Sequence, residues 1–127
     1  MGHEGRENHP CLRAYLESQM AQLTAEQMRI LFFDQDSGSL IDEQIHFGTA
    51  TQVEVRYQQI VRQAFLLGSA FIVLSHNHPS GNPSPSRQDI DYTRTIVSVC
   101  KALDIRVHDH IIVSANGSFS FREQGYM

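Results

Sequence analysis

The stretch AFIVLSHNHPSGNPSPSRQD, residues 70–89, decides how this chain folds and where its chemistry lies. It begins with an apolar run, residues 70–74, that is typical of a buried β-strand. His76 and His78 follow this run, and Asp89 comes after a loop rich in Pro, Ser and Gly. Alternate side chains of an extended chain point the same way, so we expect the two imidazoles to face one side together.

These three side chains form a ligand set of the kind found in catalytic zinc sites. Two imidazoles and one carboxylate hold the metal and leave the fourth position to water. A second interpretation needs no metal, because Ser86-x-x-Asp89 also fits a capping box at the start of a helix. The two interpretations are compatible, since a helix start can position a ligand as well as cap the helix. The sequence therefore predicts a metal site formed by His76, His78 and Asp89.

The segments on either side of this stretch predict an α/β fold. Helical spacing of apolar residues indicates helices over residues 10–23 and 53–67, and a third from about residue 86. Alternating or β-rich runs bounded by turns indicate strands over residues 28–34, 40–47, 70–75, 105–113 and 118–121. Asn116-Gly117 is the hairpin turn before the last strand, and residues 76–85 form a loop. This order implies a mixed sheet with helices on its faces. Open α/β sheets favour sites at the ends of strands, where the predicted ligands lie.

The composition indicates one compact domain. The chain has 127 residues, of which 41% are hydrophobic, and this is enough for a core. Its longest apolar stretches, around residues 64–74 and 111–113, are too short to span a bilayer, so no membrane partner is expected. The polar N-terminus has no signal-peptide core. Cys11 and Cys100 stand alone, and a reducing cytoplasm is therefore the expected location.

The charge of the chain argues against nucleic acid as a direct partner. Ten basic and fourteen acidic residues give a net charge of −4, and no basic block occurs. Binding to a duplex through its phosphates normally needs a basic face. A nucleic-acid role is thus disfavoured for this domain, although folding could gather arginines into a local patch.

A second His-x-His pair, His108 and His110, flanks Asp109 on the predicted strand 105–113. No third ligand follows this pair at a loop. We therefore interpret both residues as structural, or as support behind the metal ligands. His46 has no assignable role.

The residues of the predicted metal site and its loop resemble those of a known family. His76-x-His78-Pro79 followed by Ser86-x-x-Asp89 matches the JAMM (MPN+) signature of zinc metalloproteases and deubiquitinases. With Ser80-Gly81 included, the string is similar to the RadC branch of that superfamily. The similarity extends over about residues 26–127, and includes residues 30–34, 47–49, 109–112 and 120–125.

This resemblance implies a three-layer α/β/α sandwich with a mixed sheet, similar to cytidine deaminases, with Zn²⁺ held by His76, His78 and Asp89. A shared fold does not import the deaminase reaction. The resemblance divides the chain into an N-terminal helix or linker, residues 1–25, and a metalloprotease-type domain, residues 26–127. Full-length members usually carry a helix-hairpin-helix domain as well. No Gly-rich hairpin precedes residue 26, so we expect the catalytic-type domain alone.

For activity, the resemblance implies a zinc-dependent hydrolase. Zinc-activated water would attack an amide or isopeptide bond of a peptide or protein substrate. Ser86 would help to stabilise the oxyanion, and Glu26 would act as general base. Glu54, near the start of a predicted helix, is the alternative base, and is otherwise a solvated carboxylate. The competing hypothesis is a non-catalytic accessory or binding module associated with DNA repair, in which the metal is structural or vestigial.

Overall fold

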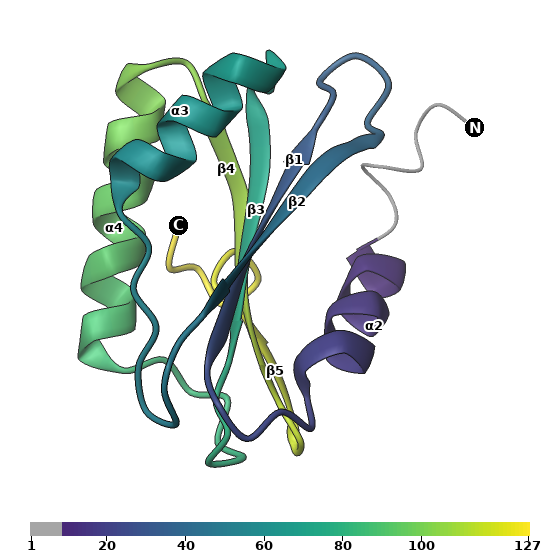
Figure 1. The fold of residues 1–127 in the computed structure, drawn as a ribbon, viewed down its shortest axis with the longest axis vertical. Coiled ribbons are helices and arrows are strands. Elements are labelled where there is room, and N and C mark those ends of the chain that lie inside the picture. The colour runs from purple at the N-terminus through teal and green to yellow at the C-terminus, as the bar shows by residue number, and fades with distance from the viewer. Residues whose placement is uncertain (1–8) are drawn as a thin grey trace.

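The computed structural model describes residues 9–127 and arranges them in three layers (Figure 1). A five-stranded sheet lies between helix α2 (His9–Met20) on one face and helices α3 (Tyr57–Leu67) and α4 (Arg87–Ala102) on the other. The strands are β1 (Gln27–Phe33), β2 (Leu40–Phe47), β3 (Phe71–Asn77), β4 (Arg106–Ser114) and β5 (Gly117–Ser120). The predicted sandwich and the predicted order of helices and strands are both confirmed.

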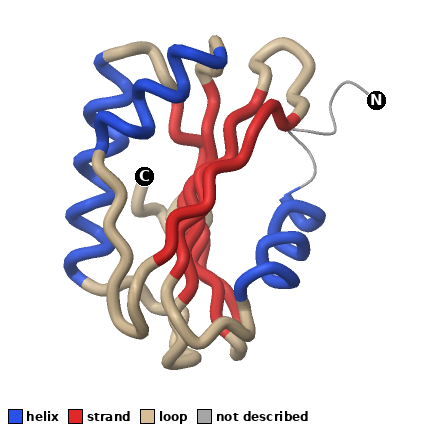
Figure 2. The backbone as a smooth tube through the Cα atoms, viewed as in Figure 1, coloured by secondary structure: helices blue, strands red, loops and turns tan. Residues whose placement is uncertain are grey.

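Strand β3 occupies the centre of the sheet, whose order is β2-β1-β3-β4-β5. Figure 2 shows the strands between helices on both sides. Strand β3 runs antiparallel to β1 and parallel to β4, and α4 makes the crossover between the two parallel strands. The other two pairs are antiparallel. Every residue of β3 is buried, as expected for a strand that has neighbours at both edges and helices on both faces.

Alternation along the central strands divides the core into two. Ile72 and Leu74 pack on the side of α3 and α4, whereas Phe71 and Val73 pack on the side of α2. Each fully buried aliphatic side chain of this kind stabilises the fold by about 1.5–3 kcal/mol. His76 continues the series of Ile72 and Leu74, so its side chain enters the layer between the sheet and α4.

Helix α2 covers the opposite face of the sheet through Leu16 and Met20, which are both fully buried. Arg13 joins it to the end of the chain, with Nη1 2.8 Å from Glu123 Oε1. The part of the expected N-terminal segment before residue 9 lies outside the described residues. Within residues 9–127, no helix combines the length and the apolar character needed to cross a bilayer.

Three predicted boundaries were wrong by two residues or more. Strand β3 continues to Asn77, beyond the predicted end at residue 75, because β4 pairs with it up to that point. The helix expected over 53–67 begins only at Tyr57, since Arg56 has an extended backbone, and Val55 before it is buried and accepts a hydrogen bond from Tyr92 Oη through its carbonyl. The first helix ends at Met20, not at residue 23.

Candidate metal centre

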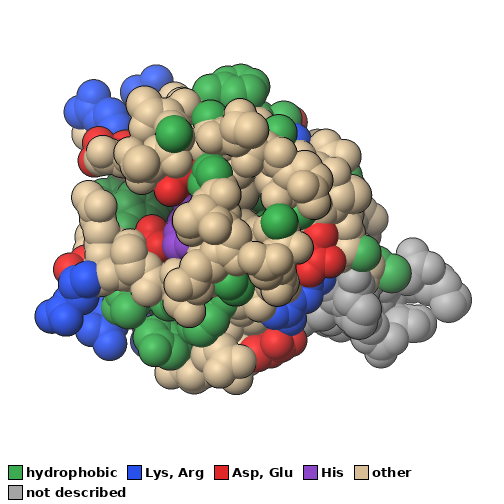
Figure 3. Space-filling view, turned by 90° about the horizontal axis from the view of Figure 1, so that it is seen from below, with side chains coloured by type: hydrophobic (Ala, Val, Ile, Leu, Met, Phe, Trp, Pro, Cys, Tyr) green, Lys and Arg blue, Asp and Glu red, His purple; other side chains and the backbone are tan. Residues whose placement is uncertain are grey.

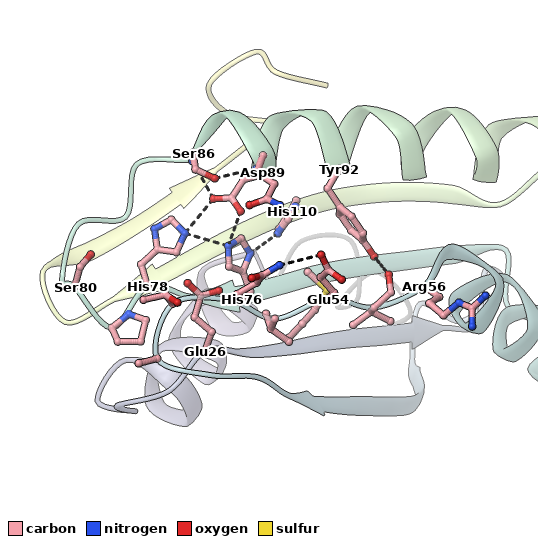
Figure 4. Close-up of a pocket in the computed structure, with 18 of the residues that line it drawn as sticks. Glu26, Glu54, Arg56, His76, His78, Ser80, Ser86, Asp89, Tyr92 and His110 are labelled. Atoms are coloured by element: carbon pink, nitrogen blue, oxygen red, sulfur yellow. Dashed lines mark hydrogen bonds and ion pairs between the residues drawn. The ribbon is translucent and has the colours of Figure 1, made fainter.

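His76, His78 and Asp89 lie together where β3 leaves the sheet (Figure 4). Their three ligand atoms all lie within 4.8 Å of one another. His76 Nε2 is 3.1 Å from His78 Nε2 and 3.3 Å from Asp89 Oδ1, and His78 Nε2 is 3.0 Å from Asp89 Oδ2. Tetrahedral ligands 2.0–2.1 Å from a zinc ion lie about 3.3 Å apart. The spacing of the donor atoms is therefore close to that of a tetrahedral zinc site.

The loop after β3 holds His78 from both ends. Its backbone N–H donates to Val113 O at 2.8 Å, which extends the parallel pairing with β4 by one residue. Its Nδ1 lies 2.9 Å from Asn82 O, and a carbonyl can only accept, so Nδ1 carries the proton. Nε2 is left with its lone pair for a metal.

A glycine is required in this loop at Gly81, which has a φ of +91°. A Cβ at this position would lie 2.8 Å from Asn116 Nδ2, which donates to the Gly81 carbonyl at 3.0 Å. The β4–β5 turn thus anchors the loop that carries His78.

Asp89 is positioned by the start of α4, and the predicted capping box is confirmed. Ser86 Oγ accepts from the Asp89 N–H at 3.0 Å, and Asp89 Oδ2 accepts from the Ser86 N–H at 2.9 Å. Burial acts to raise the pKa of Asp89, but the close approach of His76 and His78 and the hydrogen bond from the Ser86 backbone hold the pKa far below its usual range. The carboxylate is therefore ionised, as a metal ligand must be.

The pKa of His78 is shifted in the opposite direction, upward. Burial acts to lower its pKa, but its hydrogen bonds to Asp89 and to the Asn82 carbonyl outweigh burial and raise the pKa above the usual value. In the absence of metal, the raised pKa favours a second proton on His78, on the Nε2 that faces Asp89. A metal ion must displace this proton to bind.

Glu26 immediately precedes β1, and its backbone is bonded on both sides to the segment that follows β2. The Glu26 N–H donates to Thr49 O at 2.6 Å, and the Gly48 N–H donates to Glu26 O at 2.8 Å. Burial raises the pKa of Glu26, while the neighbouring His76 and His78 lower it and Asp89 raises it further. These couplings, and the view in Figure 4, place the Glu26 carboxylate beside the ligand cluster.

The three candidate ligands and Glu26 line a cavity of about 680 Å³. Glu54 and Ser86 line the same cavity. Glu54 lies on the extended segment before α3, where its Oε2 accepts from Gln52 Nε2 at 2.9 Å. Ser86 Oγ already accepts from Asp89, so its hydroxyl hydrogen is available to a ligand in the cavity. Figure 3 views the molecule from this end and shows a histidine in a hollow with acidic side chains beside it.

The two histidines of the second pair have different surroundings. His110 Nε2 lies 2.8 Å from His76 Nδ1, directly behind the ligand. The His108 ring packs edge-on against Phe71, on the α2 side of the sheet. A β-bulge separates them, because Ile72 pairs with Val107 while Val73 pairs with Asp109. His46 lies on β2 near Gln44 and does not line the cavity.

Two residues beside the site were missed by sequence reasoning. Asn77 lies between the two histidines and bonds to both neighbours of Glu26: its Oδ1 accepts from the Gln27 N–H and its Nδ2 donates to Ala25 O. Thr93 contacts His110 across 17 residues of sequence. No local pattern marks either residue, since the partner comes from another element.

The mixed sheet between two helical layers, with this ligand cluster at the end of its central strand, defines a domain of the JAB/MPN type. A family model described as RadC-like JAB domain matches residues 7–126, so the chain belongs to the RadC-like JAB domain family. It is also similar to UPF0758 protein SPO0054 of Ruegeria pomeroyi, with 38% identity over 113 residues. That similarity covers 89% of this chain and 50% of the relative, so the chain spans about half the length of the curated relative it matches.

Proposed function

We propose that this domain is a zinc-dependent hydrolase of the JAMM type that cleaves an amide or isopeptide bond in a peptide or protein substrate. One observation carries the proposal: three metal-ligand atoms within 4.8 Å of one another line the same cavity as the half-buried Glu26. His76, His78 and Asp89 would hold the ion, which supplies Lewis-acid activation of water and lowers the pKa of that water towards about 7.

The chain's own residues would then carry the proton and the developing charge. Glu26 takes a proton from water as the water oxygen attacks the substrate carbonyl carbon. The Ser86 hydroxyl donates a hydrogen bond to the oxyanion of the tetrahedral intermediate. As the C–N bond breaks, Glu26 passes its proton to the leaving nitrogen, which leaves as an amine while the carbonyl carbon becomes a carboxylic acid. This acid then loses its remaining proton to the amine or to solvent and becomes a carboxylate.

Glu26 is better supported than Glu54 as the base. Its carboxyl group is coupled electrostatically to His76, His78 and Asp89, and burial raises its pKa towards the range in which a carboxylate shuttles protons. Glu54 is exposed and hydrogen-bonded to Gln52. A base must lie within hydrogen-bond reach of the proton that it takes, which favours the carboxylate beside the ligands.

A non-catalytic binding module associated with DNA repair is the weaker alternative. Such a module has no need of a half-buried carboxylate beside a cluster of three candidate ligands. We also propose a cytoplasmic location, which the two unpaired cysteines, Cys11 and Cys100, support.

The test combines metal analysis with hydrolysis of quenched peptides and of isopeptide-linked lysine peptides. We expect about one zinc per chain, no zinc in His78→Ala, and hydrolysis that a chelator abolishes and zinc restores. His46→Ala, a histidine outside the cavity, is the matched control and should retain both properties. Equal zinc in wild type and His78→Ala would refute the site. Zinc binding without hydrolysis of any substrate in the panel would favour the binding module.

A further inference from the structure

We propose that Thr93 and His110 are positioning residues that fix the tautomer of His76, so that His76 presents Nε2 to the metal. The inference rests on the metal site of the proposed function and not on the hydrolysis. It is built from a chain of hydrogen bonds whose direction can be determined one link at a time.

The first link is the hydroxyl of Thr93, which lies 2.7 Å from two atoms, Asp89 O and His110 Nδ1. A backbone carbonyl can only accept, so the single hydroxyl hydrogen points to Asp89 O. The oxygen of Thr93 must therefore accept from His110. It follows that His110 carries a hydrogen on Nδ1.

The second link is the His110 ring, which is fully buried. Among the described residues, no carboxylate oxygen is hydrogen-bonded to this ring, and its flat face stacks on Phe121 with centroids 4.8 Å apart. A buried imidazole without an anionic partner is neutral, because an unpaired charge in such a place costs several kcal/mol. A neutral ring with its hydrogen on Nδ1 has a bare Nε2.

The third link joins this bare nitrogen to the ligand. His110 Nε2 lies 2.8 Å from His76 Nδ1, and one of the two nitrogens must donate. Since His110 Nε2 carries no hydrogen, His76 Nδ1 carries it. A histidine that binds a metal is neutral, so His76 Nε2 then presents its lone pair. This atom lies 3.1 Å from His78 Nε2 and 3.3 Å from Asp89 Oδ1. This chain of hydrogen bonds begins at the backbone carbonyl of one candidate ligand, Asp89, and ends at the ring of another, His76.

The orientation of the His110 ring is fixed by its neighbour Asp109 and by Ser120 and Phe121, near the C-terminal end of the sequence. Asp109 Oδ1 accepts from the His110 backbone N–H at 2.7 Å, and Asp109 Oδ2 accepts from Ser120 Oγ at 2.6 Å. The Phe121 N–H donates to His110 O, and its ring is tilted only 12° from the His110 ring. The segments around Asp109 and Phe121 therefore act together as a clamp behind the site.

Thr93→Val is the decisive variant, because it removes the hydroxyl and keeps the shape. We expect zinc affinity to fall about tenfold or more, as is usual when a partner of a metal ligand is lost. Thr95→Val is the matched control: Thr95 Oγ1 makes the same type of bond, to Asp91 O at 3.0 Å, but faces solvent. Its zinc affinity should equal that of wild type. Equal affinity in Thr93→Val and Thr95→Val would overturn the inference.

A second pair of variants separates the hydrogen bond from packing. The amide of His110→Gln can accept from His76 and donate to Thr93, whereas His110→Phe keeps the ring stack and loses both bonds. We expect His110→Gln to retain clearly higher zinc affinity than His110→Phe. The reverse order would contradict the inference.

The tautomer itself can be read by NMR, with long-range ¹H–¹⁵N correlations of the histidine rings in wild type. We expect the Nδ1–H form for both His76 and His110, with and without zinc. A bare Nδ1 on either ring would refute the inference. The metal-free spectrum already reports the tautomer, so this result does not depend on the proposed function. Absence of zinc binding would refute the metal site. Absence of hydrolysis would refute the proposed function and leave the tautomer result unchanged.

Discussion

Asn77 Oδ1 accepts a hydrogen bond of 2.7 Å from the backbone N–H of Gln27, although 50 residues separate the two in sequence. Asn77 Nδ2 also donates to Ala25 O at 3.0 Å. One side chain between the two histidine ligands thus holds both neighbours of Glu26. The strand that carries the ligands therefore also determines where the proposed base lies.

Replacement of Asn77 should impair catalysis more than metal binding. Asn77→Ala removes the acceptor of the buried Gln27 N–H, at a cost of about 1–3 kcal/mol, and the donor to the exposed Ala25 carbonyl, which water can replace. We expect kcat to fall at least tenfold while zinc stoichiometry is unchanged. Asn77→Asp, which can still accept from Gln27, should be intermediate. Loss of zinc in Asn77→Ala, as judged by metal analysis, would show that the residue supports the ligands instead.

The two candidate bases are separated by a matched pair of variants. Glu26→Gln should retain zinc and lose at least a hundredfold in kcat, because removal of a general base costs about 10²–10⁴-fold. Glu54→Gln should retain both zinc and most activity. Kinetics on the peptide that wild type cleaves best provide the measurement. If Glu54→Gln is the inactive variant, the assignment of Glu26 is wrong.

Zinc affinity should depend on pH through His78. Its pKa is raised, because the bonds to Asp89 and the Asn82 carbonyl outweigh burial, and a bound metal must displace the proton. Below this raised pKa, affinity should fall about tenfold per pH unit for one displaced proton. Competition with a chromophoric chelator between pH 6 and pH 8 measures the slope. A flat profile over that range would contradict proton displacement.

Acid should destabilise the metal-free fold through His110. Burial holds its pKa well below the usual value, so below pH 6.5 the unfolded chain binds a proton that the folded chain does not. This stability is complete above the unfolded pKa and is lost as pH falls, by at most about 1.4 kcal/mol per unit. Urea unfolding at pH 6.5 and pH 5 measures the loss.

The control for this pH effect is His110→Gln, which cannot titrate at that position. The lowered pKa of His46 acts in the same window in both proteins and cancels. The raised pKa of His78 acts above pH 6.5, in the opposite direction, and so falls outside the range. The same acid loss in variant and wild type would assign the effect to other groups.

Gly48 is expected to tolerate no side chain. A Cβ would lie 2.2 Å from Gln52 O and 2.6 Å from Val53 Cβ, so the segment bonded to Glu26 would have to shift. We expect Gly48→Ala to cost about 1–3 kcal/mol of stability, as overpacking does, and to lower activity. Gly68→Ala meets no neighbour within 4 Å and should lower stability through its left-handed backbone alone, with activity intact. Thermal unfolding and kinetics on both variants distinguish the two effects.

The sequence was sufficient for the sandwich, for the order of its elements and for the three candidate ligands. These features depend on local patterns: the apolar run of residues 70–74, the alternation that carries His76 onto the α4 side, and the Ser86-x-x-Asp89 cap. Such patterns lie within one strand or one helical turn, so they can be recognised in the sequence without knowledge of the rest of the fold.

Only the tertiary structure decided how the ligands are supported. Alternation alone would turn His108 and His110 to the same face, but the bulge in β4 turns His110 towards His76 and leaves His108 against Phe71. The late start of α3 follows in the same way from the burial of Val55. The three candidate ligands thus lie in one short stretch of sequence, whereas Thr93, Asn77 and His110 acquire their partners only when distant elements pack together. Hydrogen bonds between such elements depend on the packed arrangement, and no local sequence pattern encodes it.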